Sequence, residues 1–141
     1  MTVRPLELTL QVRPQARFDI IDVTRALRDE YGDLLDRYRN ALYCSYHTTA
    51  GYFDQHLSAR LQHSRDKLAD FVSVFQRVFP QHADYEHDKI HLRSELTDEE
   101  KVVEPINADS HLTFISSGLK NCVTYDNAPA HPVDRGALAV V

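Results

Sequence analysis

The clearest alternation of hydrophobic and polar residues lies near the start of the chain. Between residues 6 and 12, leucine or valine occupies every even position, and Glu, Thr or Gln occupies the odd ones. A period of two predicts a β-strand with one buried face. Pro14 ends the pattern, and residues 17–20 follow as a short partner strand.

The period then changes to that of a helix. After Asp22, apolar residues recur at spacings of three and four from Val23 to Tyr31, and Gly32 follows them. Asp22 is a typical N-cap and Gly32 a typical C-cap, so the pattern predicts a helix between them. An antiparallel strand pair followed by a helix indicates an α+β fold rather than a βαβ unit.

Further strands follow from apolar runs. Residues 41–46 are continuous, mostly apolar and rich in tyrosine, which predicts a central strand buried on both faces. The remaining predictions are a strand at 121–125, a turn at 126–129, and the start of one or two more strands at 132–133 and 136–141. Cys44 and Cys122 fall in these runs, and Cys44 is interpreted as an inert core thiol.

The second half of the chain carries the longer helices. Residues 53–79 predict a helix that Pro80 ends; unbroken, it would span about 40 Å, so we expect a break near His63 with Ser64 capping a second helix. Residues 109–118 predict a helix that Asn107 or Asp109 caps and Gly118 closes. Residues 81–104 predict a long loop with one helical turn at 98–102, and loops of that length are functional or disordered.

Composition narrows the class of protein. The chain has 141 residues, which predicts a single domain over 1–141. The formal net charge of −5 argues against a nucleic-acid partner, and no run is long and apolar enough to predict a membrane span. Two cysteines without a CxxC motif, and an N-terminus unlike a signal peptide, predict a cytoplasmic protein.

Three polar clusters stand at element boundaries, and each contains a histidine. They are His47-Thr48-Thr49, Tyr85-x-His87-Asp88 and Asn107-x-Asp109-Ser110-His111. Three histidines from separate segments, with carboxylates nearby, are a ligand set for a catalytic divalent metal, Mg or Zn. Imidazole also suits Mn, Fe and Ni, and the carboxylates suit Mg. Without a metal, His47, His87 or His111 can serve as general acid or base, with Asp109 beside them.

The same clusters suit a phosphorylated small molecule. The N-terminus of the helix at 109–118 favours an anion, and Thr48, Thr49, Arg93, Asn107 and Ser110 supply hydrogen-bond donors. The alternative is structural, because Asn, Asp, Ser and Thr before a helix are also ordinary caps. The residues alone leave an enzyme, a binding module and a structural protein open.

The order of three motifs resembles a known family. H-T-T-A after an apolar strand, then Y-x-H-D, then N-A-D-S-H-L with Gly118 downstream, is similar to the YjbQ family of secondary thiamine-phosphate synthase-like proteins. The resemblance runs from about Phe18 to Val133. It implies an α+β domain with β-sandwich-like mixed sheets and helices, assembled as a homotrimer with polar residues in a cleft near subunit boundaries.

The resemblance also implies an activity. A thiamine-phosphate synthase joins a pyrimidine pyrophosphate to a thiazole phosphate, releases pyrophosphate and ordinarily uses Mg²⁺. The motif residues of the family fall on His47, His87, Asn107 and His111. The sequence departs from the family pattern at two places. The family usually has an Asn-Glu pair shortly after H-T-T-A, and here Asp54 is the candidate to replace it. The chain ends in D-R-G-A-L-A-V-V and contains no tryptophan, as if the usual C-terminal strands were absent.

Overall fold

The strands form two small antiparallel sheets. The structure is a computed structural model that describes residues 4–127 and 138–140. One sheet has the order β1 (Ile20–Asp22), β5 (Leu138–Val140) and β3 (Gly51–Tyr52), and the other pairs β2 (Asn40–Cys44) with β4 (Cys122–Asp126). The mixture of helices and strands confirms the α+β prediction. The strand pairs of the described residues are all antiparallel, so the expected sheets of mixed direction are not found there.

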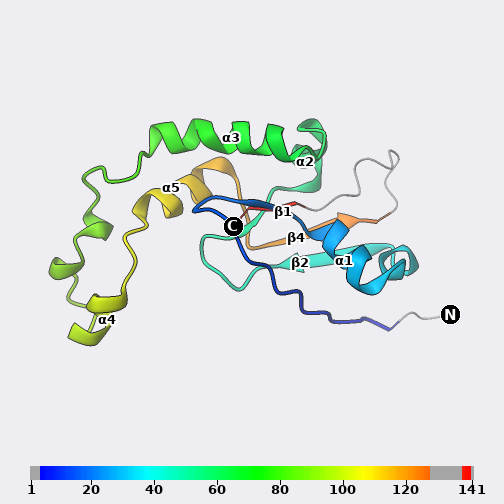
Figure 1. Cartoon of the computed structure of the whole chain (residues 1–141), viewed down its shortest axis with the longest axis horizontal. Coiled ribbons are helices and arrows are strands. Elements are labelled where there is room, and N and C mark those ends of the chain that lie inside the picture. The colour runs from blue at the N-terminus through cyan, green and yellow to red at the C-terminus, as the bar shows by residue number, and fades with distance from the viewer. Residues whose placement is uncertain (1–3, 128–137, 141) are drawn as a thin grey trace.

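The helices pack around these strands, and one of them lies in a segment that extends away from the body. They are α1 (Val23–Tyr31), α2 (Gln55–Arg60), α3 (Arg65–Val78), α4 (Asp98–Val103) and α5 (Ala108–Ser117), with 3₁₀ turns η1 (Leu34–Arg37), η2 (Glu86–Asp88) and η3 (Ile90–Leu92). Figure 1 shows α3 running along the top of the molecule with α5 beside it. The segment between them leaves the body as an arm that carries α4 and then returns to α5.

The caps predicted at Asp22, Gly32, Ser64 and Gly118 are present. The Asp22 carboxylate accepts a hydrogen bond from the Arg25 N–H at 2.9 Å, and Gly32 ends α1 at a φ of 67°. The predicted break in the long helix is confirmed: Ser64 caps α3, after Gln62 and His63 adopt positive φ values of 58° and 44°. Gly118 closes α5 in the left-handed conformation, as predicted.

The core consists of two apolar clusters that meet at β3. The first lies between α3, α5 and β1, and its buried members are Ile20, Phe53, Leu68, Val72, Phe114 and Leu119. The second lies between α1 and the β2–β4 pair, and its buried members are Val23, Leu27, Tyr43, Tyr52, Val123 and Tyr125. Tyr52 and Phe53 are neighbours in sequence and belong to different clusters, because successive residues of an extended chain point to opposite sides.

The predicted strand at 6–12 is wrong. These residues belong to no strand of the described part, and Leu6 is 52% exposed. Alternation marks a half-buried segment, and Leu10 and Val12 are in fact half-buried, but a strand also needs a hydrogen-bonded neighbour. The predicted partner strand is β1, and it pairs with β5 instead. Residues 6–12 therefore lie beside the core without hydrogen bonds to a neighbouring strand.

The strand predicted at 41–46 exists as β2, but it is not buried on both faces. Tyr43 is buried, whereas Leu42 is 67% exposed and Cys44 is exposed. β2 has a single partner, β4, and the outward face of this pair points to solvent. An apolar run shows that a strand is present without showing whether a second layer covers it. The interpretation of Cys44 as a core thiol is therefore wrong.

The remaining predictions mostly hold where they can be compared. The segment 81–104 contains only η2, η3 and α4, and Thr97 with Glu100 forms a capping box at the helical turn expected near 98–102. β5 falls within the strand expected at 136–141. Residues 128–137 lie outside the described residues, so the rest of the turn at 126–129 and the strand at 132–133 stay predictions. The described helices include none with the length and apolar character to cross a membrane.

The two clusters are joined by a close contact between backbones. The Tyr52 N–H donates to the Lys120 carbonyl at 2.8 Å, and the Lys120 N–H donates back at 2.8 Å. At Gly51, an added Cβ would lie 2.3 Å from the Lys120 carbonyl oxygen and 2.9 Å from the Phe114 ring. β3 can therefore approach this segment only because residue 51 has no side chain.

Gly51→Ala should destabilise the protein by about 2–3 kcal/mol or more, because the colliding atoms are backbone and cannot move aside. The free energy of unfolding, from urea denaturation followed by circular dichroism, measures this. Gly118→Ala is the control: its Cβ would meet nothing within 4 Å, and only its φ of 84° is unfavourable. That strain should cost about 1 kcal/mol. Equal losses in the two variants would contradict the packing argument.

Candidate functional site

The candidate site is centred on two histidine rings that come from different segments. His87 lies in η2 of the arm and His111 at the end of the first turn of α5, and their ring centroids are 5.1 Å apart at an interplanar angle of 58°. The Nδ1 atom of His87 is buried and makes no hydrogen bond within the described residues, and it lies 3.7 Å from Asp88 Oδ1. The fold thus brings together two of the three histidines singled out by their motifs.

The arm is held against α5 by a carboxylate. Asp88 Oδ1 accepts a hydrogen bond from the Ala108 N–H, the first of the helix, at 3.0 Å. Asn107 is the N-cap residue, but its side chain makes no capping bond, and its Oδ1 is buried without a hydrogen-bond partner among the described residues. A carboxylate satisfies one of the free N–H groups of a helix N-terminus and complements its dipole. The anion position expected for a phosphate is therefore partly served by Asp88.

The environment of His111 keeps its imidazole uncharged. Burial is the main factor that lowers the pKa of His111, and the nearby charges of His87, His47 and Arg93 lower it further, against the opposing effect of Glu104. An imidazole with a lowered pKa is neutral near pH 7 and can accept a proton or bind a metal. His111 is thus available in its uncharged form, which can act as a base.

His47 lies at the edge of the same cluster. Its charge contributes to the lowered pKa of His111, but its side chain is exposed. Its Nδ1 atom lies 3.1 Å from Thr49 Oγ1 and accepts the Thr49 N–H at 3.2 Å. The Asn121 amide donates to the carbonyls of His47 at 3.0 Å and Ala50 at 3.1 Å, which fixes the loop beside β4. Thr48 in this loop is exposed.

Two charged residues predicted for the site are engaged in ion pairs. Asp109 is buried in the first turn of α5 and accepts from Arg17 at 2.7 Å. Arg93 pairs with Glu95 at 2.6 Å and with Glu104 at 2.8 Å, and these hydrogen bonds raise the pKa of Arg93. Both side chains thus fasten segments of the chain to one another. Ser110 is half-buried in α5, and its N–H donates to the Asn107 carbonyl at 3.0 Å.

The three histidines do not converge as a complete ligand set. Among residues 4–127 and 138–140, no group of three or more His, Cys, Asp or Glu side chains is placed to hold a metal ion. The donor types suit Zn²⁺ or another divalent ion, but a catalytic site needs three such ligands at close range. The divalent metal therefore stays a prediction, and the chemistry that the described side chains offer by themselves is proton transfer.

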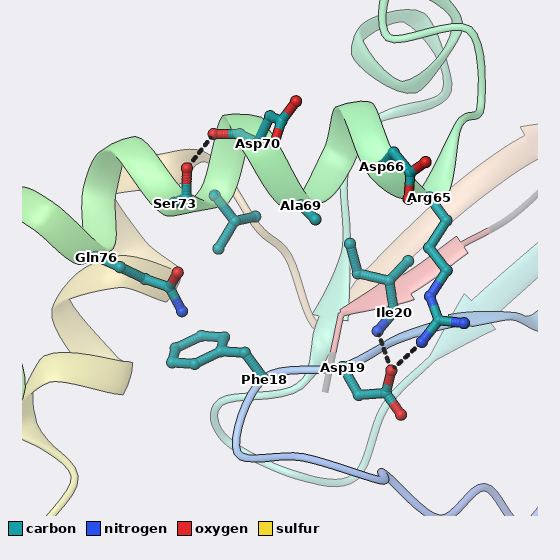
Figure 2. Close-up of a pocket in the computed structure, with 10 residues that line it drawn as sticks. Phe18, Asp19, Ile20, Arg65, Asp66, Ala69, Asp70, Ser73 and Gln76 are labelled. Carbon is teal, nitrogen blue, oxygen red and sulfur yellow. Dashed lines mark hydrogen bonds and ion pairs between the residues drawn. The ribbon is translucent and has the colours of Figure 1, made fainter.

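A hollow of about 370 Å³ lies elsewhere, between α3 and the segment that enters β1. Figure 2 shows Arg65 reaching from α3 to Asp19, whose Oδ1 it meets at 2.7 Å. Backbone N–H groups of Gln15 and Ile20, together with Arg65, lower the pKa of the buried Asp19 carboxyl. Asp19 thus anchors the N-terminal segment to α3. The residues that line this hollow include none predicted for the site.

The sequence did not single out Arg17, Asp19 or Arg65 as contacts. Arg17 and Asp109 are separated by 92 positions, and Asp19 and Arg65 by 46. Ion pairs between such distant positions leave no periodic or motif signal. Asp88, in contrast, was part of the Tyr85-x-His87-Asp88 motif, although its role as a contact to α5 was not foreseen.

No protein-family model, curated protein or solved structure matches this chain. The resemblance to the YjbQ family accordingly depends on the three sequence motifs.

The lowered pKa of His111 predicts a pH dependence of stability. Since the pKa in the folded chain lies below the unfolded value of about 6.5, protonation disfavours the folded state. The contribution is complete above pH ~6.5 and is lost as the pH falls through the folded pKa. His111→Gln should therefore lose less stability than wild type between pH 7.5 and 5 in urea denaturation.

His56→Gln is the matched control, because His56 is exposed on α2 and is not among the groups that shift His111. Its pH profile should follow wild type. A His111→Gln profile that also follows wild type would contradict the burial of the imidazole.

The Arg17–Asp109 pair should stabilise the fold. Arg17→Ala leaves the Asp109 carboxylate, whose side chain is 8% exposed, without its cation. We expect a loss of about 1–3 kcal/mol in the free energy of unfolding. The loss should shrink in an Asp109→Asn background, which a double-mutant cycle measures.

The exposed Arg28–Asp36 pair serves as the comparison, with side chains 38% and 44% exposed. Arg28→Ala should cost less than about 1 kcal/mol. A coupling energy near zero for Arg17 and Asp109 would contradict a stabilising role of this pair.

Proposed function

We propose that this chain binds a small phosphorylated metabolite at the histidine cluster and acts on it by proton transfer. The observation that carries the proposal is the contact between the His87 and His111 rings, whose centroids are 5.1 Å apart. The lowered pKa of His111 favours the uncharged form, which can take a proton from a substrate near neutral pH. The Nδ1 atom of His87 and the Oδ1 atom of Asn107 make no hydrogen bond among the described residues, and a ligand would satisfy them.

The particular reaction in this proposal comes from the motif resemblance. It is that of a secondary thiamine-phosphate synthase, a transferase that joins a pyrimidine pyrophosphate to a thiazole phosphate. The thiazole nitrogen would form the new C–N bond as the C–O bond to pyrophosphate breaks, and pyrophosphate would leave. His111 and His87 would exchange protons with the departing pyrophosphate, and His47 would close the edge of the site. Thr48, Thr49, Asn107 and Ser110 would contact phosphate groups. Asp109 and Arg93 would act through the ion pairs that hold α5 and the arm in place.

The setting of the site belongs to the same proposal. The order of the motifs agrees with a YjbQ-like homotrimer. The two cysteines without a CxxC motif agree with a location in the cytoplasm. The negative net charge agrees with a small-molecule substrate rather than a nucleic acid. A divalent ion, Mg²⁺ or Zn²⁺, stays a prediction, because the described side chains offer two neighbouring imidazoles rather than three converging ligands.

A second candidate is a non-catalytic homotrimer that binds a metal or a phosphorylated metabolite. The ion pairs of Asp109 and Arg93 favour it, because they remove one candidate catalytic acid and one phosphate-binding cation from the site. The same histidines would then recognise a ligand without turning it over.

The test combines binding with turnover. Inorganic pyrophosphate is titrated into the protein while the imidazole resonances are followed by NMR. Condensation of the pyrimidine pyrophosphate with the thiazole phosphate is assayed with Mg²⁺ present. His111→Gln and His87→Gln should each reduce turnover by about 10²–10⁴-fold, with the circular dichroism spectrum unchanged.

His56→Gln should keep full activity, since His56 is exposed on another helix. Pyrophosphate binding without turnover would select the second candidate. If pyrophosphate shifts the imidazole resonances of neither His87 nor His111, the proposal of a phosphorylated ligand is wrong.

A further inference from the structure

Cys44 and Cys122 face each other across the β2–β4 pair. They are direct partners in the strand register, although they are 78 residues apart in the sequence. Both are free thiols on the exposed face of the pair, and their Sγ atoms are 2.7 Å apart. They are also the only two cysteines of the chain. The two cysteines therefore form a solvent-accessible dithiol, and within one chain each has only the other as a possible disulfide partner.

The backbone at this position suits a covalent link. The Ser45 N–H donates to the Asn121 carbonyl at 2.7 Å, so Ser45 and Asn121 form a hydrogen-bonded pair. Pairs alternate along an antiparallel ladder, and Cys44–Cys122 is thus a non-hydrogen-bonded pair. Cα atoms of such pairs are about 4.5 Å apart, which lies within the roughly 4.4–6.8 Å that disulfides span. Neither strand has to move for a bond to form.

The thiol pair also interacts electrostatically. The hydrogen bond with Cys122 raises the pKa of Cys44, and burial adds to the shift. Two thiolates at this separation repel each other, and a disulfide removes both charges. Burial is the main factor that raises the pKa of Tyr52 to about 12, and the charges of Tyr43, Cys44 and Cys122 add to it.

We propose that Cys44 and Cys122 are a two-electron redox site that forms a reversible intramolecular disulfide by exchange with small-molecule disulfides of the glutathione class. One cysteine thiolate attacks a sulfur of the reagent and expels one thiolate, which leaves a mixed disulfide. The second cysteine thiolate attacks the protein sulfur of that bond and expels the other thiolate. The two protons lost by the cysteines end on two molecules of reduced thiol, so the cysteines are oxidised and the reagent is reduced.

The site is joined to the histidine loop through its immediate neighbours. Ser45 follows Cys44 and begins the loop that carries His47, and Asn121 precedes Cys122 and donates to the carbonyls of His47 and Ala50. Oxidation would therefore lock the two strands where this loop is attached. The inference does not depend on the proposed function, because it uses only the strand register and the thiols.

The first measurement counts thiols. Reduced protein is treated with oxidised glutathione, quenched with a maleimide and weighed intact. Wild type should become a monomer that has lost two hydrogen atoms and takes no maleimide, and dithiothreitol should restore two maleimide adducts. Cys44→Ser and Cys122→Ser should each hold one glutathione instead, because the second thiol is missing.

The same treatment in concentrated urea is the control for geometry, and it should give glutathione adducts instead of the internal disulfide. Two glutathiones on folded wild type, or chiefly disulfide-linked dimers, would overturn the proposal. Circular dichroism checks that the serine variants fold, which the exposed positions should allow.

A second readout is thermal. A disulfide between Cys44 and Cys122, which are 78 residues apart, would restrict the conformations of the unfolded chain. The oxidised form should therefore melt on the order of 10 °C higher than the reduced form. The double variant Cys44→Ser/Cys122→Ser should show no shift after the same treatment. An unchanged or lower midpoint in oxidised wild type would show that the folded strands do not accommodate the bond.

Discussion

The close approach of β3 to the Lys120 backbone is the constraint on which the other contacts depend. Two hydrogen bonds of 2.8 Å join Tyr52 to Lys120, and the Lys120 backbone leaves no room for a Cβ atom at position 51, which is glycine. Because Tyr52 packs into one core cluster and Phe53 into the other, this contact also joins the clusters. Lys120 then follows α5 and precedes β4, so both elements take their positions from it. A larger residue at position 51 would separate the helix that carries His111 from the loop that carries His47.

The arm between α3 and α5 is positioned by charge rather than by apolar packing. Asp88 accepts the first N–H of α5, and Arg93 joins two parts of the arm by pairing with Glu104, which lies just before that helix. Arg17 pairs with Asp109 in the first turn of α5. The Asp88 carboxylate also lies next to one imidazole, with His87 Nδ1 3.7 Å from Asp88 Oδ1. Burial and neighbouring charges lower the pKa of His111, which favours its neutral form.

The β2–β4 pair links the two sites discussed above. Its inner face carries Tyr43 and Tyr125, whose rings meet edge to face at 5.6 Å in the second core cluster. Its outer face carries the thiols Cys44 and Cys122. Asn121 connects this ribbon to the His47 loop. A change at the thiols therefore acts on the same backbone that supports the histidine loop, and this physical link needs no movement of the core.

Local patterns were enough to predict α1, the break before α3 and the close of α5, because caps and glycines act within a few residues. The three histidine motifs were also visible in the sequence. The tertiary structure decided what depends on distant partners. Residues 6–12 alternate but find no strand to pair with, and Cys44 lies on an uncovered face. Asp109 and Arg93 meet opposite charges, while the His87 and His111 rings meet each other. Periodicity records which residues prefer burial, whereas the identity of each contact depends on which segments the fold brings together.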